Sequence, residues 1–277
     1  MKPAPFNYQR PRDIASALSV MTGAEGVVKI IAGGQSLGPM LNLRLVAPDT
    51  ILDITGIAEL KRADVTKGEL TLGACVTHAD IEDGRVPDVT RGAMQRVAAA
   101  IAYRAVRNRG TIGGSLSHAD PSADWVSALT ALGASLSLRS ARGTRRVAMQ
   151  DFIIGALESV IAPDEMLEAV HVPARSTSAR WGYVKSCRKT GEFAHAIGAV
   201  LIDPDAGQAR IVIGAVEAAP IVLDDADALF GGKIDGAFAS HFDARVADRL
   251  LADAGMADAT DRHIHVAVLR KAIAEAA

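Results

Sequence analysis

The 277-residue chain is poor in cysteine, in aromatic residues and in excess charge of either sign. Its two cysteines, Cys75 and Cys187, form no Cys-x-x-Cys pair, so this chain alone cannot hold an iron–sulfur cluster and we expect buried, free thiols. The formal net charge of −2 argues against nucleic acid as the main partner. No apolar run is long enough to span a bilayer, and the N-terminus lacks a signal-peptide core, so we expect a cytoplasmic protein.

Constellations of catalytic or metal-binding side chains are also missing. The sequence contains no Ser-His-Asp order, no carboxylate pair and no nucleophile elbow, so we expect no catalytic residue in this chain. His78 with Asp80, and His263 with His265, lie two residues apart in segments that we expect to be helical, where this spacing does not place both side chains on one face. Neither pair has a third ligand, so we predict no metal site.

Two glycine-rich stretches are the main feature that the sequence does contain. The first, residues 30–38, reads Ile-Ile-Ala-Gly-Gly-Gln-Ser-Leu-Gly and follows an apolar segment typical of a short buried strand. Gly33 and Gly34 permit a sharp turn, and backbone amides gathered in such a turn bind phosphate groups. The stretch lacks the glycine spacing of a dinucleotide fingerprint and the lysine of a P-loop, and alone it is more often an ordinary tight turn.

The second stretch, residues 109–124, is again rich in glycine and hydroxyl groups. It contains Thr-Ile-Gly-Gly-Ser at 111–115 and ends at Asp120 and Pro121, which we predict as the N-cap and first residue of a helix reaching about Leu132. Two separated loops of this kind suit a long, extended ligand held at two points, because a single phosphate group would need only one.

Together the two stretches closely resemble the paired FAD-binding motifs of the medium, flavin-carrying subunits of molybdenum hydroxylases, the carbon monoxide dehydrogenase and xanthine dehydrogenase group. The resemblance extends to residues 39–44, 117–124 and 185–193 and covers nearly the whole chain in order. Gln35 departs from the histidine that is frequent in the family. The resemblance implies that this chain binds FAD through Ile30, Ile31, Ala32, Gly33, Gly34, Gln35, Ser36, Leu37, Gly110, Thr111, Gly113, Gly114, Ser115, His118, Asp124, Lys185 and Phe193.

The resemblance implies that the amides of residues 32–36 hold the FAD diphosphate. It also implies that the second stretch contacts the diphosphate and the flavin end of the cofactor. Four of the implied residues also have ordinary alternatives. Asp124 is equally suited to stabilise the first turn of a helix. His118 is equally suited to lie on an exposed loop. Phe193 would otherwise be a core residue, and Lys185 a solvated one.

The resemblance also implies partner subunits. Electrons would pass from a molybdopterin centre in a large subunit, through two 2Fe–2S clusters in a small subunit, to FAD in this chain and then to a terminal acceptor, in a dimer of heterotrimers. Two alternatives stay open: a self-contained FAD-dependent oxidoreductase of the same fold, and a flavin-free assembly or binding protein. Arg104, Arg107 and Arg109 form either a solvated basic face or a docking site for an acidic partner.

The order of predicted elements indicates an α+β protein, because strands precede helices instead of alternating with them. The resemblance implies a two-subdomain FAD-binding domain of the PCMH type at 1–175 (subdomains about 1–56 and 57–175), followed by a smaller C-terminal α+β domain of antiparallel strands and helices at 176–277. Periodicity predicts helices at 13–21, 77–82, 90–107, 122–132, 240–254 and 261–276, and strands at 27–31, 50–54, 69–74, 135–139, 144–147, 165–173, 181–187, 196–202 and 209–216.

Overall fold

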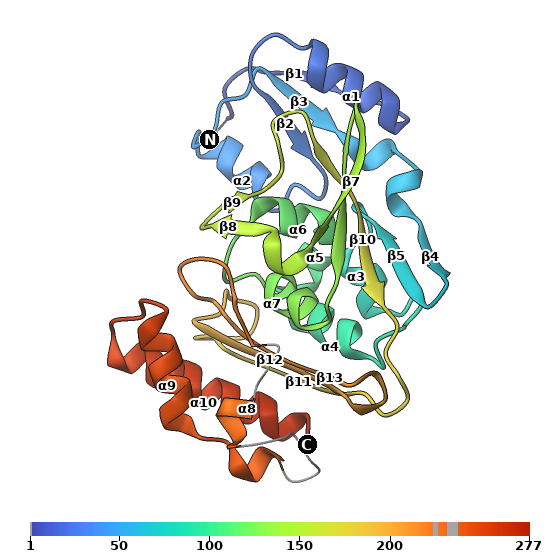
Figure 1. Cartoon of the computed structure of the whole chain (residues 1–277). Helices are drawn as coiled ribbons and strands as arrows, with labels where there is room; N and C mark the ends of the chain where they lie inside the picture. The colour runs from blue at the N-terminus through green and yellow to red at the C-terminus, as the bar shows by residue number, and fades with distance from the viewer. Residues whose placement is uncertain (1, 224–226, 232–237) are drawn as a thin grey trace.

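Three larger β-sheets follow one another along the chain, and a fourth, two-stranded sheet forms at residues 153–159, in the computed structural model, which describes residues 2–223, 227–231 and 238–277 (Figure 1). The N-terminal sheet is parallel and has the strand order β1-β3-β2. Helix α1 begins where the Asp13 carboxylate accepts a hydrogen bond from the amide of Ser16, as an N-cap should. The elements of this unit are β1 (Asn7–Gln9), α1 (Ile14–Gly23), β2 (Val28–Ile31), α2 (Leu37–Asn42) and β3 (Thr50–Asp53), followed by the 3-10 turns Ile54–Gly56 and Glu59–Lys61.

The central sheet is antiparallel, with the order β4-β5-β10-β6-β7, and helices pack beside it (Figure 1). Its core includes α7, all eight residues of which are buried, because α7 lies between this unit and the third sheet. The elements are β4 (Ala63–Thr66), β5 (Glu69–Gly73), α3 (His78–Glu82), α4 (Ala93–Ala100), α5 (Arg104–Arg107), α6 (Ile112–His118), α7 (Asp124–Ala131), β6 (Ser135–Ser140), β7 (Gly143–Ala148), β8 (Ile153–Gly155), β9 (Glu158–Ser159) and β10 (Met166–Pro173).

The third sheet, β11-β12-β13-β14, is antiparallel and is covered on both faces, by α7 on one and by α10 on the other (Figure 1). Every residue of β12 is buried for that reason. Gly182 allows α10 to approach closely, since a Cβ there would lie 1.8 Å from the carbonyl oxygen of Ala272. The elements are β11 (Arg180–Ser186), β12 (Ala196–Asp203), β13 (Gln208–Gly214), β14 (Ile221–Leu223), α8 (Asp227–Phe230), α9 (Ala244–Asp253) and α10 (Ala259–Glu275).

Most predicted elements are confirmed, and so is the α+β class. The hairpin around Gly143, the strands that became β10 to β13 and both C-terminal helices lie within a few residues of their expected places. Both thiols are free as predicted. Cys75 is also buried, which raises its pKa to about 12, but Cys187 is only half-buried, so the prediction of burial is wrong there.

The single helix predicted over 90–107 is wrong. The chain leaves helical geometry after α4, with Ile101 extended and Ala102 at a φ of 42°, and resumes it in α5. The carbonyl oxygens exposed by this break are used elsewhere: Ala100 accepts from Lys185 Nζ, and Ile101 and Ala102 accept from the Arg107 guanidinium. These long-range and local partners compensate the lost helical hydrogen bonds.

The second glycine-rich stretch is not a loop either, because residues 112–118 form helix α6, capped by the Thr111 hydroxyl. The helix start predicted at Asp120 and Pro121 is also wrong. Asp120 caps only a turn, accepting from the amide of Ser122, and α7 begins at Asp124. The Thr111 cap was equally visible in the sequence, but two following glycines are poor helix formers and favoured a loop.

Candidate functional site

The two glycine-rich stretches, far apart in sequence, lie against one another. A Cβ on Gly33 would lie 2.0 Å from the carbonyl oxygen of Arg109 and 2.8 Å from the Cα of Gly110, so only glycine fits between these backbones. A Cβ on Gly114 would lie 3.9 Å from the Cβ of Ala32. The structure therefore joins the two predicted motifs into one site, at the C-terminal end of β2 and the N-terminal end of α6 (Figure 1).

The first stretch carries a run of backbone donors without described acceptors. Among the hydrogen bonds that the structure describes, none uses the amide of Gly33, Gly34, Gln35 or Ser36 as its donor. Gly34 has a φ of 72°, which turns the chain at this point, and the Gln35 side chain donates back to the carbonyl of Gly33. Successive unused amides around such a turn form a concavity suited to an anion.

The second stretch differs, because its amides already have protein acceptors. The amides of Ile112 and Gly113 donate to Val76 and Ala74, and those of Gly114 and Ser115 donate to the side chain and carbonyl of Thr111. Gly113 is buried against Ala74, where a Cβ would lie 2.5 Å from the Ala74 Cβ.

Exposed groups remain on this second stretch for a ligand. Gly114 is exposed and Ser115 is half-buried. The hydroxyls of Ser36 and Ser115 have no hydrogen-bond partner among the described residues. Of the second motif, we therefore expect Gly114 and Ser115 to reach the ligand directly, with Gly110, Thr111 and Gly113 fixing the backbone.

The outer members of the predicted set lie around these two stretches. Ile30 and Ile31 are half-buried in β2, and Ile30 packs on the N-terminal core, which leaves mainly backbone groups for a ligand. Leu37 is the first residue of α2. His118 is the last residue of α6 and is half-buried, so the alternative of a fully exposed loop histidine is wrong.

Asp124 takes part in a buried ion pair that ties α7 to the third sheet. Its Oδ1 accepts from Lys185 Nζ at 2.8 Å and from the Tyr183 hydroxyl at 2.8 Å, and both partners come from β11. The side chains of Asp124 and Lys185 are each 10% exposed, so the alternative of a solvated lysine is wrong. Burial raises the pKa of Asp124, an effect that Lys185 and Tyr183 oppose, and burial also raises the pKa of Tyr183.

Phe193 is 60% exposed, so the alternative of a core phenylalanine is also wrong. It follows a turn that lies against the 101–103 break: a Cβ on Gly191 would lie 3.1 Å from the Ala102 carbonyl and 3.2 Å from the Tyr103 ring. An exposed aromatic side chain held on this turn is free to stack on a ring system. Tyr103, 56% exposed, lies beside the same turn.

Comparison with known proteins identifies the family of this chain. Residues 4–175 match the family described as FAD binding domain in molybdopterin dehydrogenase. The chain belongs to this family. The caffeine dehydrogenase subunit beta of a Pseudomonas species is 35% identical over 80% of this chain and 76% of that protein. The carbon monoxide dehydrogenase medium chain of Afipia carboxidovorans is 32% identical over 75% of this chain and 72% of its own length. The crystal structure of quinoline 2-oxidoreductase from Pseudomonas putida 86 matches all of this chain and 98% of the matched one, with a TM-score of 0.87 and 32% identity.

Membership establishes the chain as the FAD-binding medium subunit of a multi-subunit molybdenum oxidoreductase, whose molybdenum chemistry belongs to a partner subunit. The residues fit the cofactor, because the two stretches carry amides and hydroxyls without described partners, and a diphosphate needs donors of this kind. Among the described residues, no group of three or more potential ligands is placed to hold a metal ion. Within the same ranges, no helix is both long and apolar enough to cross a membrane.

The arginines that precede the second motif of this medium subunit are largely committed to internal ion pairs. Arg107, only 11% exposed, bonds both oxygens of Glu82, and Arg104 bonds Glu82 and Asp83. Arg109 is exposed, and it is its carbonyl that contacts Gly33. The cluster is therefore largely neutralised within the chain, which leaves little free positive charge for an acidic partner.

Tyr183 was missed in the sequence, and His78 was considered there only as a metal ligand. Tyr183 stands two positions before Lys185, on the same face of β11, and this spacing was a usable signal for a shared partner. His78 is buried behind Gly110, where it accepts from the Trp125 indole at 3.1 Å. Burial and the nearby Arg107 lower the pKa of His78 to about 4, so it is neutral at physiological pH.

Proposed function

We propose that this medium subunit binds FAD by its diphosphate on the amides of Gly33, Gly34, Gln35 and Ser36, with the exposed Gly114 and Ser115 across from them. The observation that carries the proposal is the contrast between the two stretches, one with unused amides and the other with amides already bonded. A diphosphate satisfies a run of unpaired donors better than water does, since hydrogen bonds to charged groups are stronger than neutral ones.

The remaining predicted contacts, His118, Asp124, Lys185 and Phe193, surround this anchor. We assign Phe193 to a face of the flavin ring, because its exposed side chain is carried on a turn fixed against the 101–103 break. The Asp124–Lys185 pair holds β11, and so that turn, in place. The bound FAD supplies the ability to accept electrons singly and to release them as a pair.

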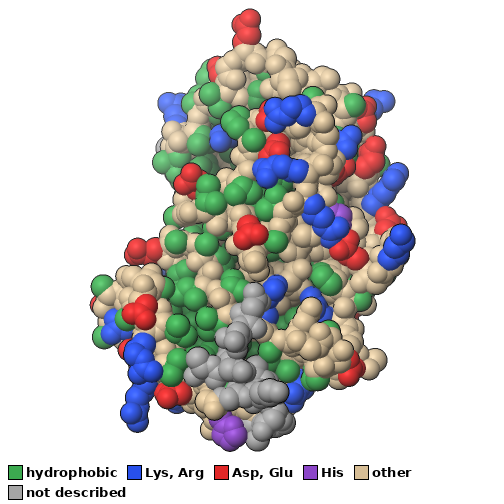
Figure 2. All heavy atoms as spheres, in the orientation of Figure 1, with side chains coloured by type: hydrophobic (Ala, Val, Ile, Leu, Met, Phe, Trp, Pro, Cys, Tyr) green, Lys and Arg blue, Asp and Glu red, His purple; other side chains and the backbone are tan. Residues whose placement is uncertain are grey.

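The partners of this subunit are a small iron–sulfur subunit and a large molybdenum subunit, arranged as a dimer of heterotrimers in the cytoplasm. A contact surface for them is available beside the site. Leu43 and Leu45 after α2, and Ile154 and Leu157 on the β8–β9 hairpin, are each more than half exposed. Hydrophobic side chains gather on this side in Figure 2, where α2 and the hairpin lie in Figure 1. Exposed apolar patches of this kind mark interaction sites.

Residues 1–175 form the FAD-binding domain, with subdomains about 1–56 and 57–175, and residues 176–277 form the C-terminal domain. The parallel sheet, the central antiparallel sheet and the third sheet support this division, since each lies within one of the three segments.

The test is the visible absorption spectrum of the purified chain and of its complex with co-expressed partner subunits, with the flavin content per chain measured. We expect bound flavin in the wild type and its loss in Gly33→Glu and Gly114→Glu. Gly23→Glu is the matched control, because a Cβ at that position meets nothing within 4 Å. Flavin retained in both motif variants would refute the site. Turnover of an organic substrate by the isolated chain would instead favour a self-contained oxidoreductase.

A further inference from the structure

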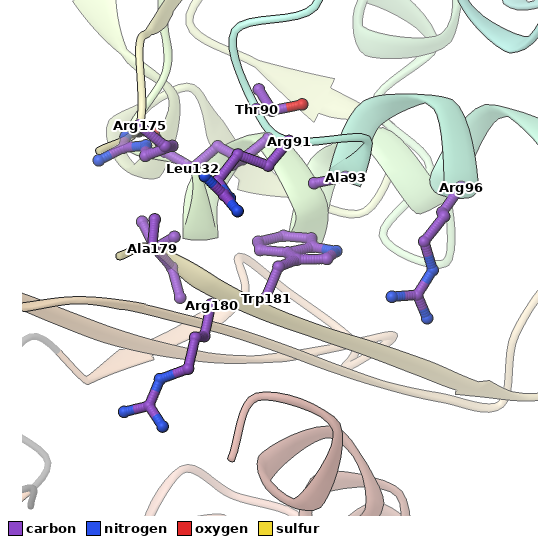
Figure 3. Close-up of a pocket in the computed structure, with 10 residues that line it drawn as sticks. Thr90, Arg91, Ala93, Arg96, Leu132, Arg175, Ala179, Arg180 and Trp181 are labelled. Carbon is purple, nitrogen blue, oxygen red and sulfur yellow. Dashed lines mark hydrogen bonds between the residues drawn. The ribbon is translucent and has the colours of Figure 1, made fainter. Parts of the chain in front are cut away.

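A recess of about 130 Å³ lies between the FAD-binding unit and the third sheet, away from both glycine-rich stretches (Figure 3). The start of α4 and Leu132 line one side, and the segment that enters β11 lines the other. Four arginines are among the lining residues: Arg91, Arg96, Arg175 and Arg180. The Trp181 ring forms its floor in Figure 3, with Arg91 and Arg175 beside the same space and the Arg180 guanidinium pointing away.

The positive charge of this recess is only partly compensated. Arg96 is paired with Glu275 at 3.0 Å, and Arg180 donates to the carbonyl of Ala277 and lies over the Phe238 ring. Among the described residues, neither Arg91 nor Arg175 has a carboxylate within 4 Å. Arg91 has no carboxylate partner among the described residues, and Arg175 feels Asp203 only through space, so a net positive potential remains at the recess.

The carboxylates closest in sequence and structure to this recess are engaged elsewhere. Asp88 accepts from the amides of Thr90 and Gly92 and from the Thr90 hydroxyl. Asp203 accepts from the amide and hydroxyl of Ser176, and the Ser176 hydroxyl lowers its pKa despite the opposing effect of burial. Asp203 therefore stays ionised, and it acts on Arg175 through space only.

Two buried donors on residues that line the recess lack acceptors. Arg175 bonds the Leu132 carbonyl and the Gln208 side chain through its two terminal nitrogens, but its buried Nε has no partner. The buried Trp181 Nε1 also has none. Buried polar groups are almost always hydrogen-bonded, so these two unpaired donors leave the lining of the recess short of acceptors. Burial lowers the pKa of Arg175, an unfavourable effect that a bound anion would offset.

We propose that this recess binds a small phosphate-type oxyanion, either free inorganic phosphate or the phosphate of a small phosphomonoester. Arg91 and Arg175 neutralise its charge, and Trp181 forms the apolar floor. Because the recess is lined from both units, with Thr90 and Arg91 on one side and Arg180 and Trp181 on the other, the bound anion strengthens the contact between the FAD-binding unit and the third sheet.

The experiment is isothermal titration calorimetry of the FAD-loaded full chain with inorganic phosphate, and separately with glycerol 3-phosphate, at an ionic strength held constant with sodium chloride. Arg91→Gln is the site variant, since its side chain is exposed and makes no described hydrogen bond whose loss would unfold the protein. Arg12→Gln removes the same charge from an exposed position near β1 and serves as the control. The flavin absorbance of every sample reports separately on the FAD site.

We expect one anion per chain, a dissociation constant about tenfold higher in Arg91→Gln, and no change in Arg12→Gln. Comparable affinity for both probes would identify a phosphomonoester as a possible natural ligand, and binding of inorganic phosphate alone would identify the free ion. Tryptophan fluorescence should respond to the anion in the wild type and not in Trp181→Phe, because the other tryptophan, Trp125, is fully buried. No saturable binding below about 10 mM, or equal affinity in Arg91→Gln, would overturn the proposal.

Discussion

Replacing Gly33 by alanine tests the close approach that creates the FAD site. The added Cβ would lie 2.0 Å from the Arg109 carbonyl oxygen, 2.6 Å from its carbon and 2.8 Å from the Gly110 Cα. A normal contact needs about 3.5 Å, so the two backbones must separate by about 1.5 Å. All three atoms belong to the backbone, and no flexible side chain can move aside instead.

The expected effect is large on both stability and cofactor affinity. Overpacking of this kind costs about 3 kcal/mol, which for a chain of this size lowers the Tm by roughly 6–12 °C. Displacing the amides by more than 1 Å removes the equivalent of about two charge-assisted hydrogen bonds, so the Kd for FAD should rise about 100-fold.

The assay is FAD titration by flavin absorbance together with urea unfolding of the FAD-free chain. Gly38→Ala is the matched control from the same segment, because a Cβ there meets nothing within 4 Å and Gly38 lies in α2. It should leave FAD affinity unchanged and stabilise the chain by about 0.5–1 kcal/mol. If Gly33→Ala bound FAD and unfolded like Gly38→Ala, the proposed contact between the two stretches would be wrong.

Three further substitutions test other parts of the structure. Lys185→Met leaves Asp124 buried without its cation and should cost about 3–5 kcal/mol near pH 7. In the folded variant the buried Asp124 carboxyl has no cation beside it, so it binds a proton more readily than it does in the unfolded chain. The loss of unfolding free energy should therefore shrink when urea unfolding is measured at lower pH. A loss that stays constant with pH would contradict the ion pair. The pKa of His78 is about 4 in the folded chain and 6.5 ordinarily, so as the pH falls the unfolded chain takes up this proton before the folded chain does. The free energy of unfolding of the wild type should therefore fall by about 3 kcal/mol between pH 6.5 and pH 4. The pH profile of unfolding of His78→Gln should lack that loss, and an unchanged slope would assign it to other groups. Gly182→Ala should lower the free energy of unfolding by about 3 kcal/mol because its Cβ meets the Ala272 carbonyl, and a neutral effect would show that α10 can move away from the sheet.

The local elements of this protein could be predicted because their determinants are close in sequence. Asp13 caps α1, Thr77 and Asp80 form a reciprocal capping box on α3, and alternation around Gly143 produces the β6–β7 hairpin. The two glycine-rich motifs likewise indicated an FAD-binding medium subunit, because both are short and contiguous.

Elements that depend on distant partners could not be predicted. The break after Ala100 is compensated in part by Lys185, from a strand far along the chain, so an alanine-rich segment that favours one helix forms two. Asp124 was predicted as an FAD contact, with a first-turn carboxylate as the alternative, and only β11 placed Tyr183 and Lys185 on it. The sequence alone thus determined most of the elements, the motifs and the family. Only the tertiary structure placed Gly33 against Arg109 and left one run of amides unpaired, because hydrogen-bond partners and close backbone contacts are set by segments far apart in the chain.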